Sequence, residues 1–171
     1  MAIYKNISGE LTQELVAPGD QPRISNVLLT NIQKVSACKV DLYIEKKISG
    51  KFYLLKQVEI PVGASLFLDD LQVGTSNNDF GLYIKLTDGA SFTLTGSIDV
   101  TGTNTNVPGT NTLYTSELSV GDEIVVSGET RTISSITGDT TAVVSAAWGS
   151  DLANDTSPDC NPTALVDVII N

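Results

Sequence analysis

The sequence contains no histidine among its 171 residues, and it has few basic side chains. Without His, the Ser-His-Asp and Cys-His arrangements of nucleophilic catalysis and every His-bearing zinc site are excluded. Lys and Arg number 10 against 20 Asp and Glu, so the net charge is −10. Because nucleic-acid binding needs an excess of basic side chains to neutralise phosphates, we expect no nucleic-acid partner.

Long apolar runs and clustered cysteines are also missing. No run approaches the roughly 18–20 apolar residues of a membrane helix, and the start, MAIYKNISGE, lacks the apolar core of a secretion signal. We therefore expect a protein that is soluble when synthesised and has no membrane partner. Cys38 and Cys160 lie far apart with no CxxC motif. Cys38 shares its even-numbered position with Val40 and Leu42 and therefore lies on the same face of a strand, which predicts a small core residue rather than a nucleophile.

What the sequence does contain is apolar alternation with period two, the pattern of half-buried strands. Turn-forming pairs rich in Gly, Pro, Asp and Ser separate these runs at short intervals, and no window of 11 or more residues carries a helical stripe. The segment 24–32 is apolar on both parities, which predicts a strand covered on both faces. Many short strands at this spacing predict an all-β protein, a sandwich or a barrel. The clearest stripes are Phe80/Leu82/Ile84/Leu86, Phe92/Leu94/Ile98/Val100, Phe52/Leu54/Val58/Ile60 and Ala164/Val166/Val168/Ile170.

The composition changes near residue 90. Residues 1–90 hold nine basic and ten acidic side chains, for a net charge of −1, whereas residues 91–171 hold one basic and ten acidic side chains, for −9. The second part is rich in Thr, Ser, Gly and Asn, but its apolar alternation persists, which disfavours disorder. We therefore infer a second folded unit.

The last apolar strand, 163–170, follows a stretch of turn-forming residues at 154–162. Because a lone terminal strand is unstable unless it joins a sheet, we expect it to return to the first sheet. Residues 93–162 would then form an acidic, Thr-rich insertion in a domain made of 1–92 and 163–171. The alternative is two domains in tandem, with the last strand belonging to the second.

Few side chains are arranged for chemistry. Asp69, Asp70, Asp79 and Asp88 lack the spacing of a calcium loop and fit a charged strand end followed by turns. Residues 120–123, VGDE, fit a solvated turn before a strand. We therefore predict no catalytic residue, no metal site and no cofactor.

Three further features have a structural and a functional interpretation. Gly96, Gly102 and Gly109 lie in a Thr-rich stretch, but no Walker-type Lys follows them, so they predict no phosphate site. Trp148 either packs in a core or stacks on a sugar or a partner surface. The run 46–51, KKISGK, predicts an exposed hairpin tip that either keeps the strand edge soluble or contacts an acidic neighbour.

Two sets of segments resemble known protein families. MAIYKNI at 1–7, FYLLK at 52–56, VEIPVGASLFLDD at 58–70 and VDVII at 166–170 resemble small β-sandwich virion proteins of tailed bacteriophages, in particular marine and cyanobacterial ones. In that family the strand after the LxLDD turn is soon followed by the terminal strand, whereas here about 70 residues intervene between these two strands. The segments 107–124 and 128–136 look like a small β-barrel module that recurs in phage capsid, tail and fibre proteins, with an extra loop at 104–109.

The resemblance implies an antiparallel, jelly-roll-like β-sandwich with an inserted small β-barrel, and it carries no catalytic residues. It implies a non-enzymatic virion structural protein, synthesised in the host cytoplasm, whose partners are the major capsid protein or other virion proteins. We expect a capsid decoration (cement) protein that forms homo-oligomers. The alternatives are a neck, tail or fibre-attachment component and, in a different class, a host-surface adhesin that binds glycan through Trp148.

Overall fold

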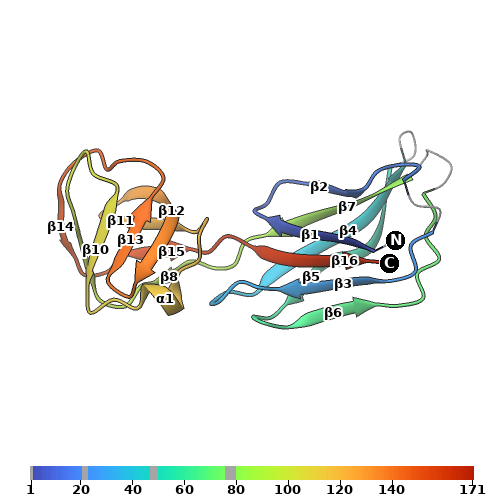
Figure 1. The fold of residues 1–171 in the computed structure, drawn as a ribbon, viewed down its shortest axis with the longest axis horizontal. Helices are drawn as coiled ribbons and strands as arrows, with labels where there is room; N and C mark the ends of the chain where they lie inside the picture. Colours follow the sequence, from blue (N-terminus) through green and yellow to red (C-terminus); the bar gives the residue numbers. More distant parts are fainter. Residues whose placement is uncertain (1, 21–22, 47–49, 76–79) are drawn as a thin grey trace. The chain divides into compact units, whose positions relative to one another are not determined.

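A computed structural model describes residues 2–20, 23–46, 50–75 and 80–171 (Figure 1). Within these ranges the chain is all-β, as the period-two pattern predicts, with a single helical turn, α1 (Tyr114–Glu117). Every strand pairing in these ranges is antiparallel. No helix in the described part of the chain has the length and apolarity needed to cross a bilayer.

The chain divides into two compact units. Unit 1 comprises Met1–Gln33, Ala37–Asp88 and Ala164–Asn171, and unit 2 comprises Lys34–Ser36 and Gly89–Thr163. By sequence, unit 1 holds eight basic and eleven acidic side chains, a net charge of −3, whereas unit 2 holds two and nine, a net charge of −7.

Unit 1 consists of two four-stranded sheets with the orders β1-β16-β3-β6 and β2-β7-β4-β5. Their strands are β1 (Ile3–Ser8), β2 (Gln13–Val16), β3 (Val27–Asn31), β4 (Cys38–Lys46), β5 (Gly50–Ile60), β6 (Ser65–Leu68), β7 (Phe80–Thr87) and β16 (Leu165–Ile170). The last strand, β16, lies between β1 and β3, so the two ends of the chain are neighbours in one sheet (Figure 1).

The two sheets of unit 1 share one aliphatic core. In most strands alternate residues point into it, although β2 contributes the neighbours Leu15 and Val16, and the predicted stripe of Ala164, Val166, Val168 and Ile170 is buried throughout. The segment 24–32 differs from the prediction that both of its faces are covered. In β3 the odd residues are buried, whereas Leu28 and Thr30 are only half-buried, because no described layer of unit 1 packs on the other face of this sheet.

Unit 2 contains eight short strands in the order β14-β9-β10-β13-β12-β11-β15-β8. They are β8 (Phe92–Thr93), β9 (Ser97–Val100), β10 (Asn106–Thr110), β11 (Glu123–Val126), β12 (Glu129–Gly138), β13 (Thr141–Val144), β14 (Leu152–Asp155) and β15 (Asp159–Asn161). The described sheet is not closed into a barrel, since β14 and β8, at its two ends, each pair on one side only. The β12 ladder is interrupted at two register shifts against β13.

Unit 2 has its own core, and that core includes two large aromatic side chains. Tyr114 and Trp148 pack with aliphatic residues from most strands of the sheet, and with Cys160. The core of unit 1 contains no aromatic side chain among its fully buried members.

Candidate functional site

The carboxylates considered as a cation site do not come together. Asp69 Oδ1 accepts a hydrogen bond from the backbone N–H of Asp70 at 2.8 Å, and Asp70 has a positive φ of 52°, so this pair forms a turn. Asp88 Oδ1 accepts the backbone N–H of Ala164 at 2.7 Å. Asp79 lies outside the described residues. Among the residues that are described, no group of three His, Cys, Asp or Glu side chains is placed to hold a metal ion.

The VGDE turn at 120–123 differs from the predicted solvated turn, because Asp122 is fully buried. Its Oδ2 accepts the backbone N–H of Ser119 at 2.7 Å, and its Oδ1 accepts that of Thr163 at 2.9 Å. The carboxylate therefore ties the turn after α1 to the end of the β15 segment. A buried charge is tolerated where such hydrogen bonds replace water.

Other acids of unit 2 fix loops in the same way. Besides Asp122, carboxylates accept backbone N–H bonds from residues distant in sequence, which orders loops that have little apolar surface to bury. These pairs are Glu117 with Thr95, Glu129 with Gly149, Asp139 with Thr115, Asp151 with Gly102 and Asp155 with Ser127. At least six of the nine acids in unit 2 thus have a structural part in the fold.

Trp148 lies in the core, with 1% of its surface exposed. Its backbone N–H donates to Asn104 O at 3.0 Å, and the Arg131 guanidinium lies 5.5 Å from the ring centroid. Arg131 also pairs with Glu129 and donates through Nε to Ala147 O at 2.9 Å. The ring is therefore not on the surface, where stacking on a sugar would require it.

The glycines of the Thr-rich stretch are required by close packing. Gly96 has φ +86°, and a Cβ there would overlap the carbonyl oxygen of Thr110. A Cβ at Gly109 would overlap the side chain of Thr112 and lie 2.7 Å from the Tyr114 hydroxyl. These contacts account for both glycines without a ligand.

Both cysteines are buried and free. Burial raises the pKa of the Cys38 thiol from 9.0 to about 11, and burial together with the nearby Asp122 carboxylate also raises that of Cys160. Because the thiolate is the reactive form, both side chains are inert at neutral pH. The position of Cys38 agrees with the prediction of a small core residue.

The outer face of the sheet β2-β7-β4-β5 carries a row of three tyrosines, of which the central one, Tyr43, is only 1% exposed. Tyr43 lies opposite Tyr53 on one side and Tyr83 on the other, with ring centroids 5.4 and 5.8 Å apart. Lys51 and Lys56 lie over the rings of Tyr43 and Tyr53 at 4.3 and 4.9 Å from the centroids. Of the predicted hairpin tip at 46–51, residues 47–49 lie outside the described residues. Lys46 lies 5.3 Å from the ring centroid of Phe80.

The outer face of the sheet β1-β16-β3-β6 carries a different pattern, which the sequence interpretation missed. Two rows of side chains cross all four strands in register. The apolar row consists of Tyr4, Ile169, Leu28 and Phe67, and the polar row consists of Asn6, Asp167, Thr30 and Ser65. The apolar residues at both odd and even positions of segment 24–32 contain the signal for the apolar row, but the same pattern also predicts a strand buried on both faces.

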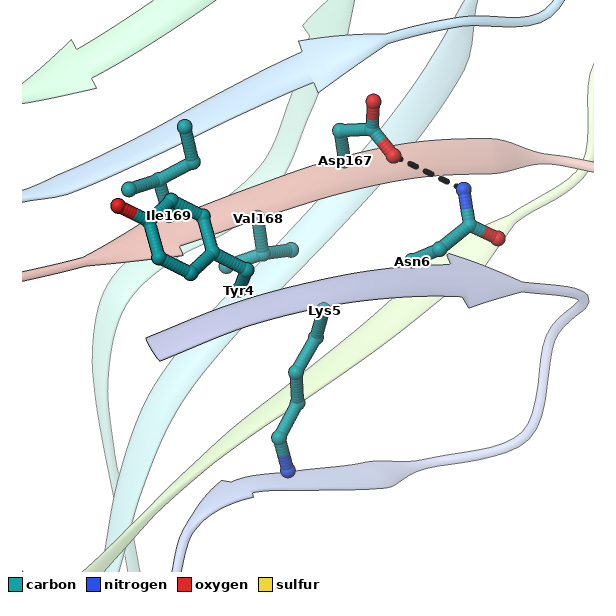
Figure 2. A pocket seen from close by; sticks show the side chains of 6 residues that line it. All are labelled: Tyr4, Lys5, Asn6, Asp167, Val168 and Ile169. Atoms are coloured by element: carbon teal, nitrogen blue, oxygen red, sulfur yellow. Dashed lines mark hydrogen bonds between the residues drawn. The ribbon is translucent and has the colours of Figure 1, made fainter. Parts of the chain in front are cut away.

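A hollow of about 310 Å³ lies between the two rows at the β1–β16 end (Figure 2). Tyr4 and Ile169 lie along one side, and Asn6 donates to Asp167 at 2.8 Å on the other. Lys5 directs its side chain to the opposite face of β1, where Nζ donates to Glu14 O at 2.6 Å. The hollow is therefore lined by an aromatic ring and an aliphatic side chain on one side and by an amide–carboxylate pair on the other.

Comparison with protein-family models, with curated proteins and with solved structures gives no significant match to this chain.

Proposed function

We propose that this chain is a non-enzymatic structural protein of a tailed-phage virion, a capsid decoration protein that binds the outer shell at repeated sites. The proposal rests on the resemblance of its sequence segments and on the distribution of its surface chemistry. The finer architecture that we propose is a jelly-roll-like sandwich for unit 1 and an inserted, barrel-like module for unit 2.

The observation that carries the proposal is that most of the exposed hydrophobic side chains lie on unit 1. Among the described residues, nine large hydrophobic side chains are exposed, and seven of them belong to unit 1: Tyr4, Leu11, Ile32, Phe52, Tyr53, Val62 and Phe67. Unit 1 also holds eight of the ten basic side chains. The net charge of unit 1 is −3, but exposed apolar side chains next to basic ones form a local surface of the kind that binds an acidic partner.

Within unit 1, the edge strand β5 offers the contact best suited to an acidic shell. It is 11 residues long and lies at one end of its sheet. The exposed fractions of Phe52 and Tyr53 are 51% and 43%. Lys51 and Lys56 lie over tyrosine rings, which restricts the positions of their ammonium groups. We call Lys51, Tyr53 and Lys56, which lie along the tyrosine row, the β5 edge surface, and we propose that it contacts the major capsid protein.

Unit 2 would then remain in solvent. Its net charge of −7 repels like-charged surfaces and keeps particles dispersed. Its carboxylates maintain the loops of a compact acidic module, and this use supports a structural protein better than an enzyme.

Quantitative mass spectrometry of purified virions tests the location. Decoration of a shell predicts on the order of hundreds of copies per particle, because symmetry repeats the site. A neck, tail or fibre-attachment component predicts about a dozen copies or fewer, and that result would overturn the decoration proposal.

The docking surface is tested separately on particles from which the protein has been removed. The double variant Lys51→Glu/Lys56→Glu is expected to lose rebinding at low salt, whereas the wild-type protein rebinds and is released as salt screens the attraction. Arg23→Glu serves as the control. It reverses a single positive charge in unit 1 at a position away from this edge. Unimpaired rebinding of the double variant would show that another surface docks.

A further inference from the structure

The outer face of the sheet β1-β16-β3-β6 is almost free of charge. The four strands together contain two charged residues, Lys5 and Asp167, and Lys5 points to the opposite face. The strands of the other sheet contain nine charged residues. This face therefore presents a single charged side chain, Asp167, within a chain of net charge −10.

The apolar row on this face is exposed at its two ends. Tyr4 is 72% exposed and Phe67 is 54% exposed, whereas Ile169 and Leu28 between them are half-buried. Each residue of the row is the register partner of the next, so the row crosses the full width of the sheet. Two projecting aromatic rings thus flank a lower aliphatic centre.

The polar row next to it retains unused hydrogen-bonding capacity. Asn6 Nδ2 donates to Asp167 Oδ1, and the hydroxyls of Thr30 and Ser65 share one hydrogen bond at 2.8 Å. Asp167 can accept further bonds, and the two hydroxyls keep one hydrogen to donate.

These two rows are complementary to themselves. A two-fold axis parallel to the strands, placed between two such faces, reverses the order of each row and keeps each row opposite its own kind. Tyr4 then lies opposite Phe67 of the second copy, and Ile169 lies opposite Leu28. In the polar row, the Asp167 carboxylate lies opposite the Thr30 hydroxyl, a hydrogen-bond donor, instead of a second carboxylate.

We propose that this face binds the same face of a second copy of the chain and forms a two-fold dimer. The lack of charge on this face favours a second copy as the partner, because two copies of net charge −10 repel each other least where each presents a nearly uncharged surface. The palindromic order of residue types, aromatic–aliphatic–aliphatic–aromatic, is what a two-fold interface requires. The inference concerns the isolated protein and does not depend on the proposed role in a virion.

Sedimentation velocity on the full chain, from about 1 μM to about 1 mM, tests the dimer. The wild-type protein is expected to dimerise within this range. Phe67→Glu is expected to raise the dimer dissociation constant about 30-fold or more, because it places a charge in the apolar row. Phe52→Glu changes a ring of similar exposure on β5 and is expected to leave the dissociation constant unchanged.

A charge-swap pair tests the geometry of the dimer. In the proposed arrangement, Tyr4→Lys/Phe67→Glu brings Lys and Glu of the two copies together and is expected to recover dimerisation relative to Phe67→Glu. Tyr4→Glu/Phe67→Glu is expected to remain monomeric. Thermal melting followed by circular dichroism verifies that each variant is folded.

Three results would overturn the proposal. They are a wild-type monomer throughout the concentration range, an oligomer other than a dimer, and equal weakening by Phe52→Glu and Phe67→Glu. A failure of shell docking with an intact dimer would reject the proposed function alone.

Discussion

The two units of this chain reach a stable all-β fold by different means. Unit 1 places long strands over one aliphatic core and carries its charges mainly on strand faces. Unit 2 has mostly shorter strands, a sheet that is not closed and a core that includes Tyr114 and Trp148. Carboxylates accept backbone N–H bonds from distant segments in both units, but in unit 2 at least six of the nine acids do so.

The largest effect on the difference between the two units is expected when the last strand, β16, is removed from unit 1. Truncation after Gly89 deletes β16, which lies between β1 and β3 and contributes Val166, Val168 and Ile170 to the core. The truncated chain is expected to be unfolded or insoluble. Replacement of residues 90–162 by a short Gly/Ser linker is expected to leave unit 1 folded, because the Ala164 N–H bonds to Asp88 and the two ends are adjacent.

Circular dichroism and thermal melting of the two shortened proteins check this prediction. A cooperatively melting truncated chain would show that β16 is dispensable to unit 1.

The loss of the buried carboxylate is expected to be the next largest effect. Asp122→Asn replaces an acceptor of two backbone N–H bonds by a group with one acceptor and a competing donor. We expect unit 2 to lose about 3 kcal/mol of stability. Fluorescence of Trp148, the only tryptophan in the chain, follows unit 2 during urea unfolding.

Glu123→Ala is the matched control, because Glu123 is exposed and adjacent in sequence. It is expected to change the free energy of unfolding by less than about 0.5 kcal/mol. Equal effects of the two substitutions would contradict a structural part for Asp122.

A smaller effect is expected from a methyl group at Gly96. Ala at this position must adopt a positive φ and overlap the Thr110 carbonyl, so Gly96→Ala should cost unit 2 about 2 kcal/mol. Gly138→Ala is the control, since a Cβ at Gly138 meets nothing within 4 Å. Urea unfolding measures both, and a neutral Gly96→Ala would contradict the close packing of β9 on the segment after β10.

One substitution is expected to stabilise unit 2. The Tyr114 hydroxyl is buried and has no hydrogen-bond partner among the described residues. Tyr114→Phe removes this unpaired group without changing the ring, and we expect a gain of about 1 kcal/mol in the free energy of unfolding. Tyr83→Phe in unit 1 is the contrasting variant, because the Tyr83 hydroxyl donates to Glu14 at 3.0 Å and its loss brings no gain. A less stable Tyr114→Phe would show that the hydroxyl is satisfied.

The smallest expected effect is the alkaline response of unit 1. Because burial raises the pKa of Cys38 from 9.0 to about 11, the fold favours the neutral thiol. This contribution to stability is complete below pH 9.0 and is lost as the pH rises through about 11. Cys38→Ala is expected to unfold with a shallower dependence on pH in this window. An unchanged slope would show that Cys38 does not contribute.

Much of the fold could be predicted from local patterns. Strand stripes depend on the period-two geometry of the backbone, so the buried positions of β16 and β7 follow from the residues themselves. The same rule failed for segment 24–32, because apolar residues on both parities are equally consistent with a covered strand and with an exposed apolar row. Which of these holds depends on what the other layers of the molecule cover.

The two rows on the outer face of the sheet β1-β16-β3-β6 and the burial of Asp122 could not be predicted, because each depends on residues that are far apart in sequence. Tyr4 and Ile169 are neighbours only because β1 pairs with β16, and Asp122 is buried only because Thr163 approaches it. The local sequence VGDE is equally compatible with a solvated turn and with a buried carboxylate. Only its long-range partners decide between the two.

The sequence by itself determined the strand-forming character of the chain, the uneven division of its charge and the lack of His-based chemistry, because these depend on composition and on local backbone geometry. The tertiary structure decided which apolar residues are core and which form a row on the surface, and which carboxylates are solvated. These properties depend on strand pairing and on layer packing, which bring together residues that local sequence does not connect.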